Sequence, residues 1–306
     1  MDKRLARQSF LGAHSDTVLA GTRVALIGVG GGGSHVAQQL AHLGVGRFAV
    51  IDPDCVEDTN LNRMVGATAE DVRRGTPKVA VTARVIHAVN PAADVCSVQC
   101  VWQERGELLR DCSAIFGCVD SISARDQLEI AARRYLVPYL DIGMDVHPVG
   151  QEFSISGQVI LSMPGELCMR CLGLITEAAL AREAARYGAA GGRPQVVWPN
   201  GLLASAAVGL FVQLVTPWHA KPVAVEYLEF DGNRHTLTRS NRLLAMLDRT
   251  CSHFESIENL GDPFWKPVPS PTRETGPPNA LRDLPTAQAR RRGVVAGGPP
   301  EKEIIA

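Results

Sequence analysis

Short apolar runs alternate with segments of helical periodicity along the first half of the chain. The run RVALIGVG at 23–30 ends in glycines, and apolar residues then recur at helical spacing over 34–43. Together they predict a strand, a tight turn and a helix. The alternation continues, and we expect strands at 47–52, 94–99, 114–120 and 137–143, with helices at 76–89, 105–110 and 123–135. Strands alternating with helices indicate an α/β fold with a doubly wound, mostly parallel sheet.

The hydrophobic pattern changes after residue 150. We expect an antiparallel strand at 154–162, helices at 175–187 and 201–215, and a closing strand pair at 223–230 and 235–239 around the Asp231-Gly232 turn. Residues 143–157 are expected to form a long loop. Residues 1–22 form a helical arm before the first strand, and the core domain is expected to span 23–260. The proline-rich segment 261–306 predicts a disordered tail.

Composition narrows the class of protein. Hydrophobic residues make up 45% and charged residues 21% of the chain, a mix typical of a globular protein. The 31 Lys and Arg residues balance 32 Asp and Glu residues, which argues against a nucleic-acid or membrane partner. The first residues lack the apolar core of a signal peptide, so we expect a cytoplasmic protein. The eight cysteines are too dilute for a disulfide scaffold, and we expect reduced thiols.

A glycine-rich turn follows the first predicted strand. Gly28, Gly30 and Gly33 satisfy G-x-G-x-x-G between a strand and a helix, where bare amides and a helix N-terminus can face phosphates. Asp52 ends the next predicted strand, where a carboxylate can accept hydrogen bonds from ribose hydroxyls. This Rossmann-like arrangement fits a dinucleotide and ATP equally well.

The segment after Asp52 favours ATP. An asparagine cluster around Asn60 is followed by Arg63 and then by Lys78, and two cations with an asparagine suit a triphosphate. Asp120 ends another buried strand, at the usual crevice of an open sheet, where it could hold magnesium. Taken singly, each of these residues also has an ordinary surface or capping explanation.

These residues resemble the ThiF/MoeB/HesA adenylyltransferases, relatives of the ubiquitin-activating enzymes, from about residue 7 to residue 215. The motifs that carry the resemblance are Arg7-Gln8, the glycines at 28–33, Asp52 and Asp54, Asn60 to Arg63, Pro77-Lys78, Asp120, and Cys168 with Cys171. The resemblance implies an ATP-dependent enzyme that adenylates the C-terminal carboxylate of a ubiquitin-like or sulfur-carrier protein.

The resemblance also implies roles for single residues. Gly31 would lie against the nucleotide, and Asp52 would bind ribose. Phosphate contacts would come from Asn60, Arg63 and Lys78, and magnesium would be held at Asp120. Arg7 would reach into the site of a partner subunit, which implies a homodimer. Ser121 stands where the family usually has asparagine, so its contact with the nucleotide is the least certain of the set.

The spacing of Cys168 and Cys171 allows one turn to present two thiolates to a zinc ion. A structural site needs two more ligands, and the late residues Cys251 and His253 are the candidates. The alternative is a pair of buried thiols without metal.

No cysteine lies between Leu172 and Asn200, the segment where a thioester-forming nucleophile would be expected. Cys55 lies beside carboxylates that would raise a thiol pKa, and Cys118 lies within a predicted buried strand. We therefore expect adenylation only, with the acyl-adenylate passed to a separate sulfur donor or conjugating protein.

Two other functions remain open from the residues alone. The first is an NAD-dependent oxidoreductase that uses the same glycine turn, although it would leave Arg63 and Lys78 unexplained. The second is a non-catalytic scaffold subunit related to activating enzymes. The identity of the adenylated acid is open as well, and a small molecule or a tRNA-linked acid would use the same ATP site.

Overall fold

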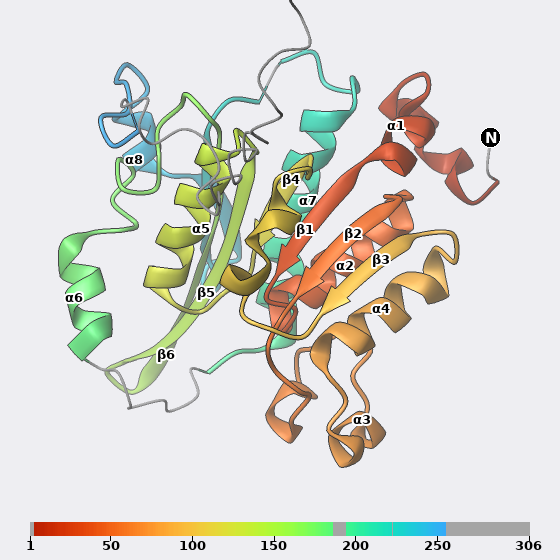
Figure 1. Ribbon diagram of the computed structural model, residues 1–306. Helices are drawn as coiled ribbons and strands as arrows, with labels where there is room; N and C mark the ends of the chain where they lie inside the picture. The colour runs from red at the N-terminus through yellow and green to blue at the C-terminus, as the bar shows by residue number, and fades with distance from the viewer. Residues whose placement is uncertain (1–2, 186–193, 222, 255–306) are drawn as a thin grey trace, which may run out of the picture. The chain divides into compact units, whose positions relative to one another are not determined.

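The computed structural model describes residues 3–185, 194–221 and 223–254, which form an eight-stranded mixed sheet (Figure 1). The strand order is β3-β2-β1-β4-β5-β6-β7-β8. The strands are β1 (Arg23–Ile27), β2 (Arg47–Ile51), β3 (Asp94–Val98), β4 (Ala114–Gly117), β5 (Tyr139–Val149), β6 (Glu152–Ser162), β7 (Glu226–Asp231) and β8 (Thr236–Arg239). Strands β1 to β5 are parallel and β6 to β8 are antiparallel. The predicted doubly wound fold with an antiparallel C-terminal extension is confirmed.

Helices cover both faces of the sheet. The α-helices are α1 (Ser15–Gly21), α2 (Gly31–Leu43), α3 (Ala69–Arg74), α4 (Lys78–Val89), α5 (Ile122–Arg134), α6 (Glu177–Ala185), α7 (Val197–Val215) and α8 (Asn241–Leu244). Three 3-10 helices are η1 (Lys3–Leu11), η2 (Asp58–Asn60) and η3 (Trp102–Leu109). Helices α2, α4 and α7 pack together on one face, and α5 and η3 pack on the other.

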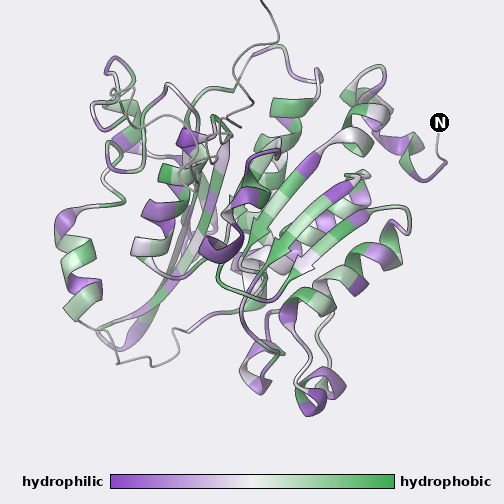
Figure 2. Ribbon diagram, in the orientation of Figure 1, coloured by the Kyte–Doolittle hydropathy of each residue, from purple (hydrophilic) through white to green (hydrophobic). Residues whose placement is uncertain are grey.

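Successive side chains of the central strands point to opposite faces of the sheet, because side chains alternate along a strand. In β1, Val24 and Leu26 join the core under α2 and α7, whereas Ala25 and Ile27 join the core under α5 and η3. A sheet buried on both faces therefore has continuous apolar strands. Figure 2 shows these strands in green between helices with purple outer faces. This doubly buried pattern is what made β1, β2 and β4 predictable.

Helix α7 is, among the described residues, the one helix long and apolar enough to cross a membrane by length and composition. Its composition has a local explanation, because it packs along α2 and against β5 and β6. Leu203, Ala207 and Phe211 on this helix are fully buried, and the Phe211 ring meets the edge of Phe116 from β4. The helix is a central element of the core.

Several predicted boundaries were wrong. Residues 143–157 do not form a long loop: β5 and β6 continue through them as a hairpin, with Pro148 opposite Phe153. Helix α7 begins at Val197, four residues earlier than expected, and β4 ends at Gly117, before the predicted end at residue 120. Helix α4 begins at Lys78, two residues later than the expected start at residue 76, with Pro77 at its N-cap.

The arm at 1–22 is helical where it is described, through η1 and α1. The chain divides into two compact units, Met1–Trp265 and Lys266–Ala306. The second unit lies outside the described residues, as does the tail at 261–306 that the sequence predicts to be disordered.

Candidate functional site

A cavity of about 320 Å³ lies at the carboxyl ends of β1, β2, β4 and β5. Strands β1 and β4 are neighbours, although β2 and β3 lie on the far side of β1, so the strand order reverses at this point. Open α/β sheets bind ligands at such a reversal, because the loops after the two strands diverge and leave a crevice. The predicted site residues Gly28, Gly30, Gly31, Asp52, Asn60, Arg63, Lys78 and Asp120 all line this cavity.

The glycine turn leads from β1 directly into α2. Gly28 has φ of +80°, and a Cβ there would lie 2.6 Å from the carbonyl oxygen of Cys118, so both the conformation and the space require glycine. A Cβ on Gly33 would lie 2.0 Å from the carbonyl oxygen of Gly28. Gly33 does not line the cavity, and its role is to let α2 pack closely on the turn.

The N-terminus of α2 opens into the cavity. Its N-cap is Gly30, which has no capping side chain, and its first turn contains no acidic residue. The positive end of the helix dipole and the first amides are therefore available to an anion. This is the arrangement that the glycine pattern predicted.

Asn200 also lines the cavity. It belongs to the segment Trp198-Pro199-Asn200, which the sequence predicts to form a substrate-channel edge or a dimer contact. It is buried in the first turn of α7, and its Nδ2 donates a hydrogen bond to the carbonyl oxygen of Val196 at 2.9 Å. A Cβ on Gly31 would lie 2.6 Å from Asn200 Nδ2. The glycine at 31 is thus needed for the close approach of α7, in addition to any contact with a ligand.

Asp52 is buried and held by backbone amides. Its Oδ2 accepts a hydrogen bond from the Val29 amide at 2.7 Å, and its Oδ1 accepts one from the Asp54 amide at 2.9 Å. Burial raises the pKa of the Asp52 carboxyl, while Lys78 and the two amides act in the opposite direction. The carboxylate is fixed at the rim of the cavity in one orientation.

Two cationic side chains, those of Arg63 and Lys78, line the cavity. Lys78 Nζ contacts Asp54 Oδ2 at 2.7 Å, and the Lys78 side chain is 12% exposed. The guanidinium of Arg63 donates to the carbonyl oxygen of Thr59 and to the Asn62 side chain. Asn60 lies three residues before Arg63 and is buried, and its Oδ1 accepts a hydrogen bond from the amide of Glu57 in the capping box of η2.

Asp120 lies three residues after β4, and its Oδ1 accepts a hydrogen bond from Gln195 Nε2 at 3.2 Å. Ser121 does not line the cavity: its Oγ caps α5 by accepting from the Ala124 amide, and it also contacts Glu183. Arg7 is exposed on η1 and does not line the cavity of its own chain. The roles expected for Ser121 and Arg7 stay predictions.

A buried ion pair forms part of the cavity wall beside β5. Arg125, on α5, is buried and lines the cavity, and its guanidinium contacts the carboxylate of Asp141. The Tyr139 hydroxyl donates to the other oxygen of Asp141 at 3.0 Å, and Arg125 also reaches the carbonyl oxygen of Ile142. Neither Arg125 nor Asp141 was predicted, because no local pattern marks a charged pair that meets between a helix and a strand.

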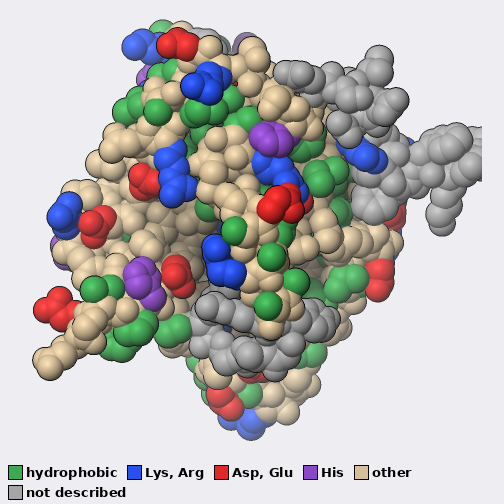
Figure 3. Space-filling view, turned by 90° about the vertical axis from the view of Figure 1, so that its left-hand side faces the viewer, with side chains coloured by type: hydrophobic (Ala, Val, Ile, Leu, Met, Phe, Trp, Pro, Cys, Tyr) green, Lys and Arg blue, Asp and Glu red, His purple; other side chains and the backbone are tan. Residues whose placement is uncertain are grey.

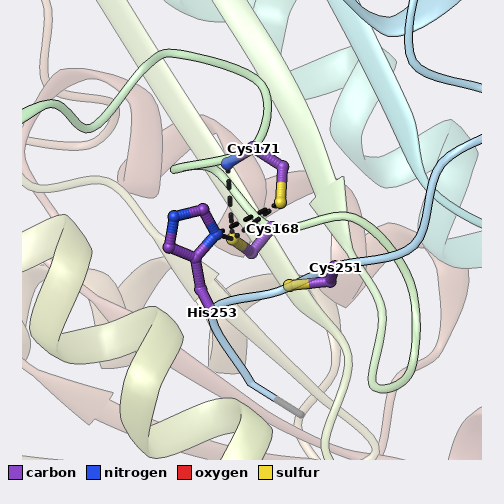
Figure 4. Close-up of side chains that lie close together, drawn as sticks. All are labelled: Cys168, Cys171, Cys251 and His253. Atoms are coloured by element: carbon purple, nitrogen blue, oxygen red, sulfur yellow. Dashed lines mark hydrogen bonds between the residues drawn. The ribbon is translucent and has the colours of Figure 1, made fainter.

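The four predicted thiol and imidazole ligands lie together (Figure 4). The ligand atoms of Cys168, Cys171, Cys251 and His253 all lie within 4.8 Å of one another. Cys168 Sγ is 3.6 Å from Cys171 Sγ, and His253 Nδ1 is 3.4 Å and 3.3 Å from these two sulfurs. A tetrahedral zinc ion spaces sulfur and nitrogen ligands about 3.5 to 3.8 Å apart. The cluster is compatible with zinc.

Two buried side chains of α5 hold the loop that carries Cys168. Glu129 Oε1 accepts from the Met169 amide at 2.9 Å and from the Ser162 hydroxyl at 2.5 Å. Arg133 donates to the same hydroxyl and to the carbonyl oxygens of Glu166 and Leu167, each at 2.8 Å. The loop is therefore fixed to α5 and β6 without any metal ion.

The two remaining cysteines of interest, Cys118 and Cys55, lie in different surroundings. Cys118 lines the cavity, and burial raises the pKa of its thiol well above the usual range. Cys55 Sγ lies 3.3 Å from Gln99 Nε2, a neutral group. Reactive cysteines normally have cationic partners that lower the thiol pKa.

The charged side chains on the face drawn in Figure 3 are of both signs and interspersed. The face shows no extended patch of Lys and Arg. A single-sign patch is the usual electrostatic sign of nucleic-acid binding.

Residues 2–252 match the ThiF family. Among curated proteins, the sulfur carrier protein ThiS adenylyltransferase of Bacillus subtilis is 32% identical over 178 residues, which cover 56% of this chain and 51% of that protein. The SAMP-activating enzyme E1 of Haloferax volcanii is 30% identical, over 53% of this chain and 57% of that protein. The sulfur carrier protein adenylyltransferase of Thermus thermophilus is 29% identical, over 78% and 88%. The matched region thus spans only about half of the first two relatives.

Solved structures show the same fold at lower identity. The structure of Escherichia coli MccB with ATP has a TM-score of 0.63 and 19% identity, over 79% of this chain and 72% of that chain. Another structure of MccB, with succinimide, has a TM-score of 0.65 over the same shares. At this identity the likeness establishes the fold alone.

Proposed function

We propose, because the chain belongs to the ThiF family, that it is an ATP-dependent adenylyltransferase. Its substrate would be the C-terminal carboxylate of a ubiquitin-like or sulfur-carrier protein. Curated relatives are named as adenylyltransferases of sulfur-carrier proteins, in Bacillus subtilis and Thermus thermophilus. A protein of the same fold, MccB, has been solved with ATP.

The observation that carries this proposal is the composition of the cavity. An open helix N-terminus, a buried ribose-type carboxylate at Asp52, and the cations of Arg63 and Lys78 line one space with Asp120. This set matches the parts of ATP: amides and cations for phosphates, and a carboxylate for the ribose hydroxyls. A hydride transfer to or from NAD would give Arg63 and Lys78 no role.

The proposed reaction needs no strong general base. The carrier carboxylate, already an anion, attacks the α-phosphorus of ATP, the bond to the β-phosphate bridging oxygen breaks, and pyrophosphate leaves with the electron pair. Lys78 and Arg63 would stabilise the charge that develops on the phosphoryl oxygens. Preorganised charge and positioning are the means of catalysis that these side chains can supply.

Magnesium fits the donor set at Asp120. Its carboxylate oxygens are the hard ligands that magnesium prefers, and the contact from Gln195 comes from a neutral amide that a cation can displace. Bound there, the ion would add positive charge beside the phosphates. The chain's own contribution is to hold that carboxylate at the mouth of the cavity.

We also propose a homodimer in which Arg7 of one subunit contributes to the cavity of the other. The support is that Arg7 is exposed and does not line the cavity of its own chain. Because segment 172–200 contains no cysteine, we propose that the acyl-adenylate passes to a separate sulfur donor or conjugating protein, in the cytoplasm.

The test is ATP–pyrophosphate exchange with a panel of carrier proteins that end in Gly-Gly. Exchange that depends on one carrier would establish adenylation and identify the substrate. Asp120→Ala should abolish that exchange, and retained exchange would refute the role of this carboxylate. ATP binding without exchange would favour another acid as substrate, whereas the absence of ATP binding would favour the scaffold or NAD functions.

We propose further that the Cys168, Cys171, Cys251 and His253 cluster binds structural zinc. All four positions are taken by protein ligands, as in sites that stabilise a fold rather than catalyse. Metal analysis of the purified protein should give one zinc per chain, and Cys251→Ser should release it and lower the melting temperature. A metal-free wild-type protein with an unchanged melting temperature in chelator would contradict this assignment.

A further inference from the structure

The first turn of α5 receives its acidic capping group from a distant part of the chain. No acidic residue lies in this turn. Instead, Glu183 on α6 accepts hydrogen bonds from the amides of Ile122, at 2.9 Å, and Ser123, at 2.8 Å. It also accepts from the Ser121 hydroxyl at 3.1 Å. With Ser121 capping the Ala124 amide, the first three amides of α5 are all satisfied.

Few contacts attach α6 to the rest of the protein. None of its residues is buried, Leu180 packs partly buried against the core beneath α5, and the strongest element contacts of α6 are with α5. An ion pair joins Glu177 of this helix to Arg170 at 2.7 Å, and the Glu177 side chain is 84% exposed. The carboxylate of Glu183 is therefore the polar anchor of α6, and most of its bonding capacity is directed to residues 121–123.

The anchored turn follows Asp120 directly. Asp120 is also contacted from the other side by Gln195 Nε2, at 3.2 Å. Residues 120–123 are thus held by Glu183 from one part of the chain and by Gln195 from another. Displacing Ser121 and Ile122 would displace the backbone that carries the Asp120 carboxylate at the cavity.

We propose that Glu183 is a positioning residue for Asp120: it fixes the N-terminal turn of α5 and thereby the placement of the carboxylate that would hold magnesium. The inference rests on the proposed function for the role of Asp120. It assigns to α6 a part in the reaction, although α6 contributes no residue to the lining of the cavity. A carboxylate at a helix N-terminus stabilises the helix wherever it occurs. At the N-terminus of α5 it also determines where the Asp120 carboxylate lies.

The experiment compares Glu183→Gln with Glu177→Gln. Glutamine at 183 keeps the size of the side chain but has one acceptor oxygen, so one of the two α5 amides loses its partner. Glu177→Gln removes the same charge from the same helix and leaves the α5 turn intact. Comparing the two variants distinguishes an effect of the position of the Glu183 carboxylate from an effect of the total charge of α6.

Three measurements are made on the full chain. Manganese binding in the presence of ATP, followed by electron paramagnetic resonance, should weaken by about two- to five-fold in Glu183→Gln, the range expected for a lost helix-terminus interaction. The magnesium concentration for half-maximal ATP–pyrophosphate exchange should rise by the same factor. Hydrogen exchange should accelerate at residues 122–124. Glu177→Gln should change none of the three.

The outcomes separate this inference from the proposed function. A fall in melting temperature with unchanged manganese binding would make Glu183 merely structural and overturn the inference. An equal shift in both variants would assign the effect to the charge of α6 and overturn it as well. If no carrier supports exchange in the wild-type protein, the proposed function fails. Manganese and ATP binding still test Glu183 in that case, because that measurement requires no carrier.

Discussion

The polar residues of the ATP-type cavity and those behind the Cys168 loop are partnered in opposite ways. In the cavity, Lys78 is paired with Asp54, whose side chain is 62% exposed. Behind the loop, the side chains of Glu129 and Arg133 are 0% and 3% exposed, and every contact is made within the protein. Lys78 therefore has a partner that a ligand can replace, whereas the groups behind the loop are saturated.

The two regions should therefore respond differently to substitution. Removing one member of a saturated buried network leaves an uncompensated charge, and the cost falls on stability. Removing Lys78 breaks an ion pair whose Asp54 partner is exposed to solvent, and the cost falls on the reaction.

Glu129→Ala should destabilise the protein by about 3 to 5 kcal/mol, because it leaves the buried Arg133 guanidinium without its carboxylate. The Met169 amide would also lose its acceptor. Urea unfolding gives the free energy of unfolding. Glu129→Gln, which retains one acceptor oxygen, should cost less. Equal denaturation midpoints for Glu129→Ala and the wild-type protein would show that the network does not support the loop.

Lys78→Ala should reduce carrier-dependent exchange by about 10²- to 10³-fold, the usual cost of removing one group that stabilises transition-state charge. The melting temperature should hardly change, because the partner Asp54 is exposed. Arg73→Ala is the matched control: its ion pair with Glu70 is exposed on α3, away from the cavity lining. If Lys78→Ala loses exchange because the protein unfolds, then Lys78 supports stability, and the difference between the two regions is wrong.

The parts of the structure that could be predicted are those with a pattern confined to a short stretch of sequence. The doubly buried strands appear as continuous apolar runs, and the glycine turn has its signal within a few residues. Both strands of the β5–β6 hairpin were predicted, but their outer ends, residues 144–149 and 152–153, were not, because none of those residues is buried and no apolar run marks them. Only the pairing of the two strands defines this part of the hairpin.

The missed site residues depend on contacts between distant segments. Arg125 on α5 meets Asp141 on β5, and Glu183 caps a helix about sixty residues earlier in the chain. A charged residue on a predicted helix is ordinarily solvated, so nothing local distinguishes these from surface groups. Cys251 and His253 were predictable because metal ligands have a recognisable residue type even when they are far apart.

The smallest expected effect is that of Asp71→Asn, in the region beside α3 and α4. The Asp71 carboxylate is buried, caps α3 through the Thr68 amide and hydroxyl, and accepts two hydrogen bonds from Arg84. These bonds hold the pKa of Asp71 well below its usual range. Because half of the Arg84 side chain is exposed, solvent screens the pair, and we expect a loss of about 1 kcal/mol.

The pH dependence of this loss has a definite sign. A carboxyl whose pKa is lower in the folded state contributes stability that is fully present above its unfolded pKa, about 3.9, and is lost as the pH falls toward the folded value. The difference in melting temperature between the wild-type protein and Asp71→Asn should therefore be constant from pH 7 to pH 5 and shrink below about pH 4. ATP–pyrophosphate exchange at pH 7 should be unchanged, because Asp71 does not line the cavity. A difference that grows on acidification would contradict the charged hydrogen bond to Arg84.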